Sequence, residues 1–123
     1  MQANRVLCVE DDEDTRYMLK TMLDFSDLES VGAPDADAAL RLMESERFSL
    51  YVLDGGLSSA RGLLLCAQIR ASDARTPIVI FSGHASAPDI EAGLRAGANA
   101  YLVKPDSSQL VSTIRRLLAA ASE

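Results

Sequence analysis

The sequence predicts a single doubly wound α/β domain, and two observations lead to this prediction. Short runs of β-branched, leucine and aromatic residues recur along the chain without the polar alternation of a half-exposed strand. Segments with the apolar spacing of amphipathic helices separate these runs. Strands that are apolar throughout and are separated by helices are typical of a parallel sheet covered on both faces. A length of 123 residues suits one compact domain that spans residues 1–123.

Five strands and the helices between them can be placed along the chain. The four stronger strands are expected at residues 6–9, 50–53, 78–81 and 100–103, and a weaker one at residues 29–33. Helices are expected after Asp14, Asp35, Gly62 and Ser86, and a final one carries an apolar stripe from Leu110 to Leu118. Asp35 and Ser86 are suited to cap their helices, and Gly97 is suited to end the fourth.

The overall composition excludes several classes of protein. Twelve Lys and Arg against eighteen Asp and Glu give a net charge of -6, which opposes direct binding to a nucleic-acid backbone. Neither a membrane-length apolar run nor a signal peptide is found, so we expect a cytoplasmic protein without a membrane partner. Cys8 and Cys66 lie in apolar segments, and the single histidine, His84, cannot complete a zinc site, so both thiols are expected to be buried and reduced.

Polar residues stand where the expected strands end. Glu10 and Asp11 follow the first strand, Asp54 the third, Ser82 the fourth, and Lys104 the fifth. Ligands of open α/β sheets bind beyond these carboxyl ends, so the side chains should meet at one site. An acidic cluster opposite Asp54 is unfavourable without a cation or proton, and Mg²⁺ prefers such oxygen ligands.

These positions resemble the receiver domain of two-component response regulators over essentially the whole chain. The family pattern is an acidic pair after strand one, a phosphoacceptor aspartate after strand three, Ser or Thr after strand four, and Lys-Pro after strand five with an aromatic residue before it. A glycine also follows the phosphoacceptor by eight residues. The matching residues here are Glu10, Asp11, Asp54, Ser82, Tyr101, Lys104-Pro105 and Gly62.

The resemblance implies a flavodoxin-like sheet of strand order 2-1-3-4-5 and a role for each matching residue. Asp54 would be the nucleophile that takes a phosphoryl group from a histidine kinase or phosphotransfer protein. Asp11, Asp54 and the Gly56 carbonyl would hold Mg²⁺ directly, and Glu10 would act through bound water. Lys104 would pair with a phosphate oxygen, which makes Asp54, Lys104 and Ser82 the catalytic set. Such a domain is not an enzyme beyond catalysing its own phosphorylation and dephosphorylation.

The resemblance also implies a switch. Ser82 would donate its hydroxyl to the phosphate and draw in its loop, and Tyr101 would follow into the vacated space. The surface formed by helix four, strand five and helix five, roughly residues 88–121, would then change. A partner or a second copy of the domain would dock there.

Several of these residues have ordinary structural interpretations. Acids from Glu10 to Asp14 would favour a helix N-terminus, which is the expected role of Asp12 to Asp14. Asp54 before Gly55-Gly56 is also typical of a turn. Ser82 could simply begin a loop, Tyr101 could be core packing, and His84 is expected to be an exposed loop residue.

Two positions depart from the family pattern. Ser58 stands where the family commonly has proline, and with Gly55-Gly56 it predicts a looser loop beside the metal. Asp106 stands where phenylalanine often follows Lys-Pro. Neither change removes a catalytic atom.

Three other functions are compatible with parts of this pattern. A haloacid-dehalogenase-type phosphatase would need a second aspartate at the position of Gly56. Nucleotide or flavin binding is disfavoured, because the sequence contains neither of the glycine-rich phosphate-binding motifs. A receiver-like interaction module that is never phosphorylated stays open. Because the chain ends soon after the last helix, we expect either a stand-alone regulator or a receiver cut from a larger protein.

Overall fold

Five parallel strands and five helices alternate along the part of the chain that the structure describes. The computed structural model describes residues 4–54, 59–104 and 107–121, with the side chains of residues 59–61 excepted. The strands are β1 (Arg5–Val9), β2 (Glu29–Ala33), β3 (Leu50–Asp54), β4 (Ile78–Ser82) and β5 (Ala100–Val103). The helices are α1 (Glu13–Phe25), α2 (Ala36–Ser45), α3 (Ser59–Ser72), α4 (Ala87–Arg95) and α5 (Ser108–Ala121). The sheet order is β2-β1-β3-β4-β5, which confirms the predicted doubly wound fold.

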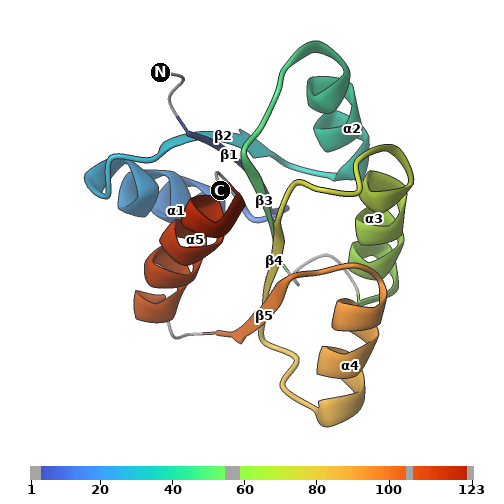
Figure 1. Cartoon of the computed structure of the whole chain (residues 1–123). Helices are drawn as coiled ribbons and strands as arrows, with labels where there is room; N and C mark the ends of the chain where they lie inside the picture. Colours follow the sequence, from blue (N-terminus) through green and yellow to red (C-terminus); the bar gives the residue numbers. More distant parts are fainter. Residues whose placement is uncertain (1–3, 55–58, 105–106, 122–123) are drawn as a thin grey trace.

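The sheet forms the middle of three layers. Helices α1 and α5 cover one face, and α2, α3 and α4 cover the other (Figure 1). Successive residues of a strand point to opposite faces, so each strand supplies both cores. In β1, Val6 and Cys8 join the α1 and α5 side, whereas Leu7 and Val9 join the other. Continuous apolar strands are therefore explained by burial on both faces.

Strand and helix ends differ from the sequence prediction by a few residues. Asp54 and Ser82 were expected just after their strands, but each is the last residue of its strand. Asp54 pairs in register with Phe81, and Ser82 with Val103, so the ladder extends one residue further than the apolar run. Helix α3 begins at Ser59, ahead of the first apolar residue of its spacing, because helix starts depend on backbone bonds more than on apolar pattern.

The predicted helix caps are confirmed. Asp35 accepts from the Ala38 amide at 2.8 Å, and Ser86 accepts from the Asp89 amide at 3.2 Å. Asp12 caps α1 by accepting from the amide and hydroxyl of Thr15 at 2.9 and 2.7 Å. These acceptors satisfy amides that the first turn of a helix leaves unpaired.

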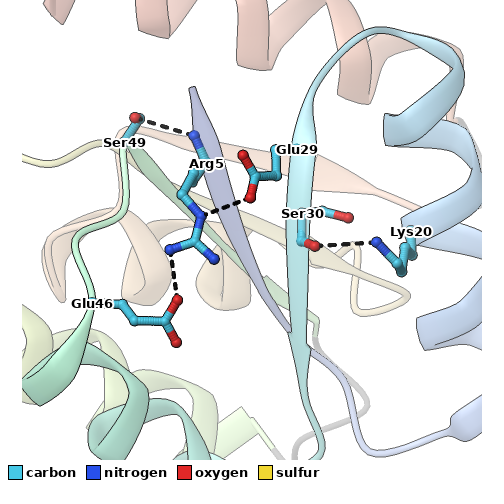
Figure 2. Close-up of polar contacts among 6 residues, drawn as sticks. All are labelled: Arg5, Lys20, Glu29, Ser30, Glu46 and Ser49. Carbon is cyan, nitrogen blue, oxygen red and sulfur yellow. Dashed lines mark hydrogen bonds and ion pairs between the residues drawn. The ribbon is translucent and has the colours of Figure 1, made fainter. Parts of the chain in front are cut away.

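Arg5 ties the amino ends of neighbouring strands together. Figure 2 shows its guanidinium between Glu29 of β2 and Glu46 beyond α2, at 3.1 and 2.6 Å. Its backbone amide donates to the Ser49 hydroxyl at 3.3 Å. This cluster lies at the end of the sheet opposite the predicted site, so it stabilises the fold without contacting the site residues.

Within the described residues, the helices reach at most 14 residues, and none combines the length and apolarity needed to cross a bilayer.

Arg70 and Gly97 fasten α3 to the turn between α4 and β5. The Arg70 guanidinium donates to the carbonyls of Gly97, Asp73 and Thr76 and to the Asn99 side chain. Gly97 has φ of +121°, and a Cβ there would lie 2.5 Å from Arg70 Cγ. The turn therefore needs glycine for its backbone and for the space that Arg70 occupies.

We expect Gly97→Ala to lower the free energy of unfolding by about 1–3 kcal/mol, because it adds both backbone strain and a clash. Urea unfolding followed by circular dichroism measures this. Gly62→Ala is the matched control: it lies in α3 with no described atom within 4 Å of the added Cβ, and should gain about 0.5–1 kcal/mol. Equal stability of Gly97→Ala and wild type would contradict the expectation.

Candidate functional site

An ion pair joins the ends of β3 and β5 at the carboxyl edge of the sheet. Lys104 follows β5, and its Nζ donates to Asp54 Oδ1 at 2.5 Å. The Asp54 side chain is fully buried, whereas that of Lys104 is 27% exposed. A buried carboxylate is costly to leave without a cation, so Lys104 compensates the charge of Asp54.

The neighbouring strand β4 supports Lys104. Its Nζ lies 5.6 Å from the centre of the Phe81 ring, within cation–π range. Its backbone amide donates to the Ser82 carbonyl at 2.8 Å. The lysine is therefore held from the sheet as well as by its partner. Phe81 had no signal in the sequence beyond its place in an apolar run.

Glu10 brings a second carboxyl group to Asp54. It directly follows β1, which lies beside β3 in the sheet, and it is only 2% exposed. Its Oε1 accepts from the Asp12 amide at 3.1 Å. Its Oε2 is buried and accepts no hydrogen bond from the described part of the chain.

The pKa of Glu10 reflects this environment. Burial raises the pKa of the Glu10 carboxyl from its usual 4.5 to about 8, and the neighbouring Asp54 adds to the rise. The Asp12 amide and the Lys104 charge oppose it. Without a further cation, a proton on Glu10 is thus the favoured way to bring the two carboxyl groups together.

The donor set fits a hard divalent cation. Two adjacent buried carboxyl groups, one with an oxygen that accepts no hydrogen bond, are ligands that Mg²⁺ prefers, and it commonly uses only one or two carboxylates from the protein. Asp11 lies exposed next to Glu10. Gly56 lies outside the described residues. Among the residues that are described, no group of three or more acidic, thiol or imidazole side chains is arranged around one metal position.

Ser82 and Tyr101 are linked through the loop that contains His84. The Ser82 hydroxyl accepts from the His84 amide at 3.0 Å. The Tyr101 hydroxyl donates to the His84 carbonyl at 2.7 Å. His84 is exposed, as expected, but its backbone connects the two residues assigned to the switch. Sequence reasoning did not foresee this link, because backbone groups carry no residue signature.

A cavity of about 80 Å³ lies beside this loop, between the sheet and helices α3 and α4. Asp54 and Ser82 line one part of it, and Tyr101, Ile80 and Ala92 line another. Gly62, the glycine of the family pattern, also borders it. Space is therefore present next to both Asp54 and Tyr101.

Other predicted positions divide into two groups. Cys8 and Cys66 are free, buried thiols, and burial raises the pKa of Cys8 to about 12. Ser58, Pro105 and Asp106 lie outside the described residues, so the two departures from the family pattern stay predictions. The roles of Glu10, Asp11, Asp54, Gly56, Ser82, Tyr101 and Lys104 also stay predictions.

The doubly wound sheet and the acid–lysine site at its carboxyl edge define a class of proteins, and comparison with known proteins identifies the family. The response regulator receiver domain family matches residues 6–115. The chain belongs to this family.

Relatives and solved structures agree. The chain is 37% identical over 115 residues to the transcriptional regulatory protein PrrA of Mycobacterium bovis and 36% identical to the response regulator MprA of Mycolicibacterium vanbaalenii, each alignment covering 93% of this chain. These cover 49% and 50% of the relatives, so the chain spans about half the length of the curated proteins it matches.

Among solved structures, a CheY-like receiver domain protein from Methanospirillum hungatei superposes with a TM-score of 0.90 and 28% identity, covering 98% of both chains. The Francisella response regulator 1452 receiver domain has a TM-score of 0.88 and 25% identity, covering 95% of this chain and 98% of the other. The family is that of two-component signalling.

The raised pKa of Glu10 predicts how stability depends on pH without metal. The folded state holds this proton more tightly than the unfolded chain, so the contribution of Glu10 to stability is lost as pH rises from about 4.5 through about 8. We expect the free energy of unfolding of wild type to fall over this interval relative to that of Glu10→Gln, which cannot ionise. Urea unfolding in chelator between pH 5 and 9 measures both. Parallel curves would show that Glu10 does not carry the effect.

Proposed function

We propose that this domain accepts a phosphoryl group on Asp54 from a phosphohistidine of a sensor histidine kinase or phosphotransfer protein. The single observation that carries the proposal is the buried Asp54 carboxylate between Lys104 and Glu10. An ordinary turn aspartate would be solvated, and a merely structural ion pair would not need a second buried carboxyl group beside it.

The step would proceed by attack of a carboxylate oxygen of Asp54 on phosphorus. The new oxygen–phosphorus bond makes an acyl phosphate, and the phosphorus–nitrogen bond breaks to release the imidazole of the donor histidine. Such transfer depends mainly on positioning and on neutralising charge. Lys104, whose Nζ contacts Asp54 Oδ1, would stabilise the negative charge on the phosphoryl oxygens during transfer.

Asp11, Asp54 and the Gly56 carbonyl would hold Mg²⁺ directly, and Glu10 would hold it through bound water. The ion would supply positive charge that offsets the repulsion between the carboxylates and the incoming phosphoryl oxygens. The buried Glu10 oxygen that accepts no hydrogen bond supports this assignment. The positive charge of the bound ion would take the place of the proton that Glu10 favours in the metal-free protein.

The phosphate would then act through the loop after β4. Ser82 would exchange its contact with the His84 amide for a phosphate oxygen. Movement of that loop would break the bond between the His84 carbonyl and the Tyr101 hydroxyl, and the adjacent cavity gives the ring room to turn inward. One added phosphate would thus alter the surface of α4, β5 and α5.

The output of this surface would be read by a partner domain, a second copy of the chain or a separate protein. PrrA is named a transcriptional regulatory protein, and the matched region is about half of it. We propose the same receiver role here, in the cytoplasm, for a domain whose chemistry is limited to its own phosphorylation and dephosphorylation.

We expect incubation with acetyl phosphate and Mg²⁺ to add one phosphoryl group to the wild type, and no adduct to form on Asp54→Asn. Intact-mass spectrometry measures this, and hydroxylamine should remove the adduct because it cleaves acyl phosphates. Asp35→Asn is the matched control, since asparagine also caps helices, and it should label normally. A wild type that takes no phosphate from any small donor or kinase would indicate a passive interaction module.

Lys104→Ala should separate phosphorylation from switching. We expect the variant to be labelled more slowly, by about 10-fold or more, and the labelled form to lack the wild-type shifts of amide resonances in α4, β5 and α5. Arg41→Ala provides the matched control, because it removes an exposed cationic side chain on α2, away from the site. A labelled Lys104→Ala protein with the full pattern of shifts would refute the coupling role.

A further inference from the structure

Arg16 of α1 connects the second strand to the acidic site. Its Nη1 donates to the backbone carbonyl of Glu10 at 2.8 Å. Its aliphatic stem crosses β2 at Gly32, where a Cβ would lie 2.9 Å from both Arg16 Cγ and Cδ. The absence of a side chain at Gly32 thus gives Arg16 the space to reach Glu10. Neither residue belongs to a motif identified in the sequence.

The bond from Arg16 completes the fixation of Glu10. The Glu10 amide donates to the Ala33 carbonyl at 2.9 Å, and its Oε1 accepts from the Asp12 amide. Because β1 ends at Val9, Glu10 lies beyond the strand itself. Arg16 supplies a donor for its carbonyl there. The backbone amide, the backbone carbonyl and Oε1 of Glu10 are therefore hydrogen-bonded, and Oε2 remains available for a ligand at the site.

The helix that carries Arg16 is itself anchored on β2. Lys20, one turn further along α1, donates to the Ser30 carbonyl at 3.3 Å, as Figure 2 shows. Arg16 and Lys20 therefore follow the same strand, with Arg16 nearer the site. A shift of α1 along β2 would change the Arg16 contact to Glu10.

We propose that Arg16, seated on Gly32, is a positioning residue that orients Glu10 for the magnesium-dependent phosphorylation of Asp54. The proposal rests on the function proposed above and extends it to a residue outside the acidic and lysine set. Arg16 acts through the Glu10 backbone and need not touch metal or phosphate. The competing explanation is that Arg16 only staples α1 to the sheet, in which case its loss would lower stability alone.

Four variants separate these explanations. Arg16→Met keeps the stem and removes the donor, and Arg16→Lys restores one donor and the charge. Gly32→Ala keeps Arg16 but adds a Cβ in the space that the Arg16 stem occupies. Arg41→Met makes the same substitution at an exposed position of α2 and is the matched control.

Three measurements are made on each variant. The first is the Glu10 carbonyl ¹³C shift in metal-free protein, which reports the hydrogen bond directly. The second is the Mg²⁺ dissociation constant from amide chemical shifts. The third is the rate of acetyl phosphate labelling against Mg²⁺ concentration, with urea unfolding run in parallel.

We expect Arg16→Met to move the Glu10 carbonyl resonance and to weaken Mg²⁺ binding about 10-fold, the usual effect of losing a residue that orients a ligand. The Mg²⁺ concentration for half-maximal labelling should rise equally, while the rate at saturating Mg²⁺ stays near wild type. Gly32→Ala should likewise raise both the Mg²⁺ dissociation constant and the Mg²⁺ concentration for half-maximal labelling. Arg16→Lys should recover part of the lost affinity, and Arg41→Met should change neither quantity.

The outcomes distinguish this inference from the proposed function. If Arg16→Met and Gly32→Ala lower stability but leave Mg²⁺ affinity unchanged, the positioning role is overturned. Labelling of the wild type would in that case still support the proposed function. A wild type that binds Mg²⁺ but takes no phosphate would overturn the function, and weaker Mg²⁺ binding in the variants would still support Arg16. A wild type that binds no Mg²⁺ would overturn both.

Discussion

The burial of Asp54 is the constraint on which the rest of the site depends. A fully buried carboxylate must be compensated, and the fold compensates it with Lys104 from β5, supported by the Phe81 ring. Glu10 works in the opposite direction, since its burial beside Asp54 raises its own pKa. The site therefore holds one carboxyl group more than its described cationic partner can neutralise, which is consistent with the uptake of a metal ion and a phosphoryl group that we propose.

A short hydrogen-bonded link runs from the strand beside Asp54 to Tyr101. Ser82 ends the strand next to that of Asp54, and the His84 backbone links its hydroxyl to that of Tyr101. These two hydrogen bonds lie beside a small cavity. In the switch that we propose, a phosphate on Asp54 would draw the Ser82 hydroxyl away from the His84 amide and so free the tyrosine. The proposed coupling thus passes through the backbone of one residue, His84.

Much of the fold was predictable from the sequence because the strands are buried on both faces. Runs such as residues 6–9 and 78–81 are apolar without alternation, and the caps at Asp35 and Ser86 have clear side-chain signatures. Less predictable were features made by backbone or by distant pairs. The start of α3 precedes its apolar spacing, Asp54 and Ser82 lie inside the ladder, and Arg16 meets Gly32 only because α1 folds back over β2. The site residues were recognised by their positions after strands, whereas their contacts required the structure.

Arg16 and Lys20 of α1 contact β2, and these contacts bear on how the edge of the sheet is protected. β2 is an outermost strand of the sheet, and strands in that position tend to recruit foreign strands through their open carbonyls and amides. Here an ammonium group occupies the Ser30 carbonyl, and a guanidinium stem lies across Gly32. These two side chains cover part of the β2 edge and so make it a poorer template for pairing with a foreign strand.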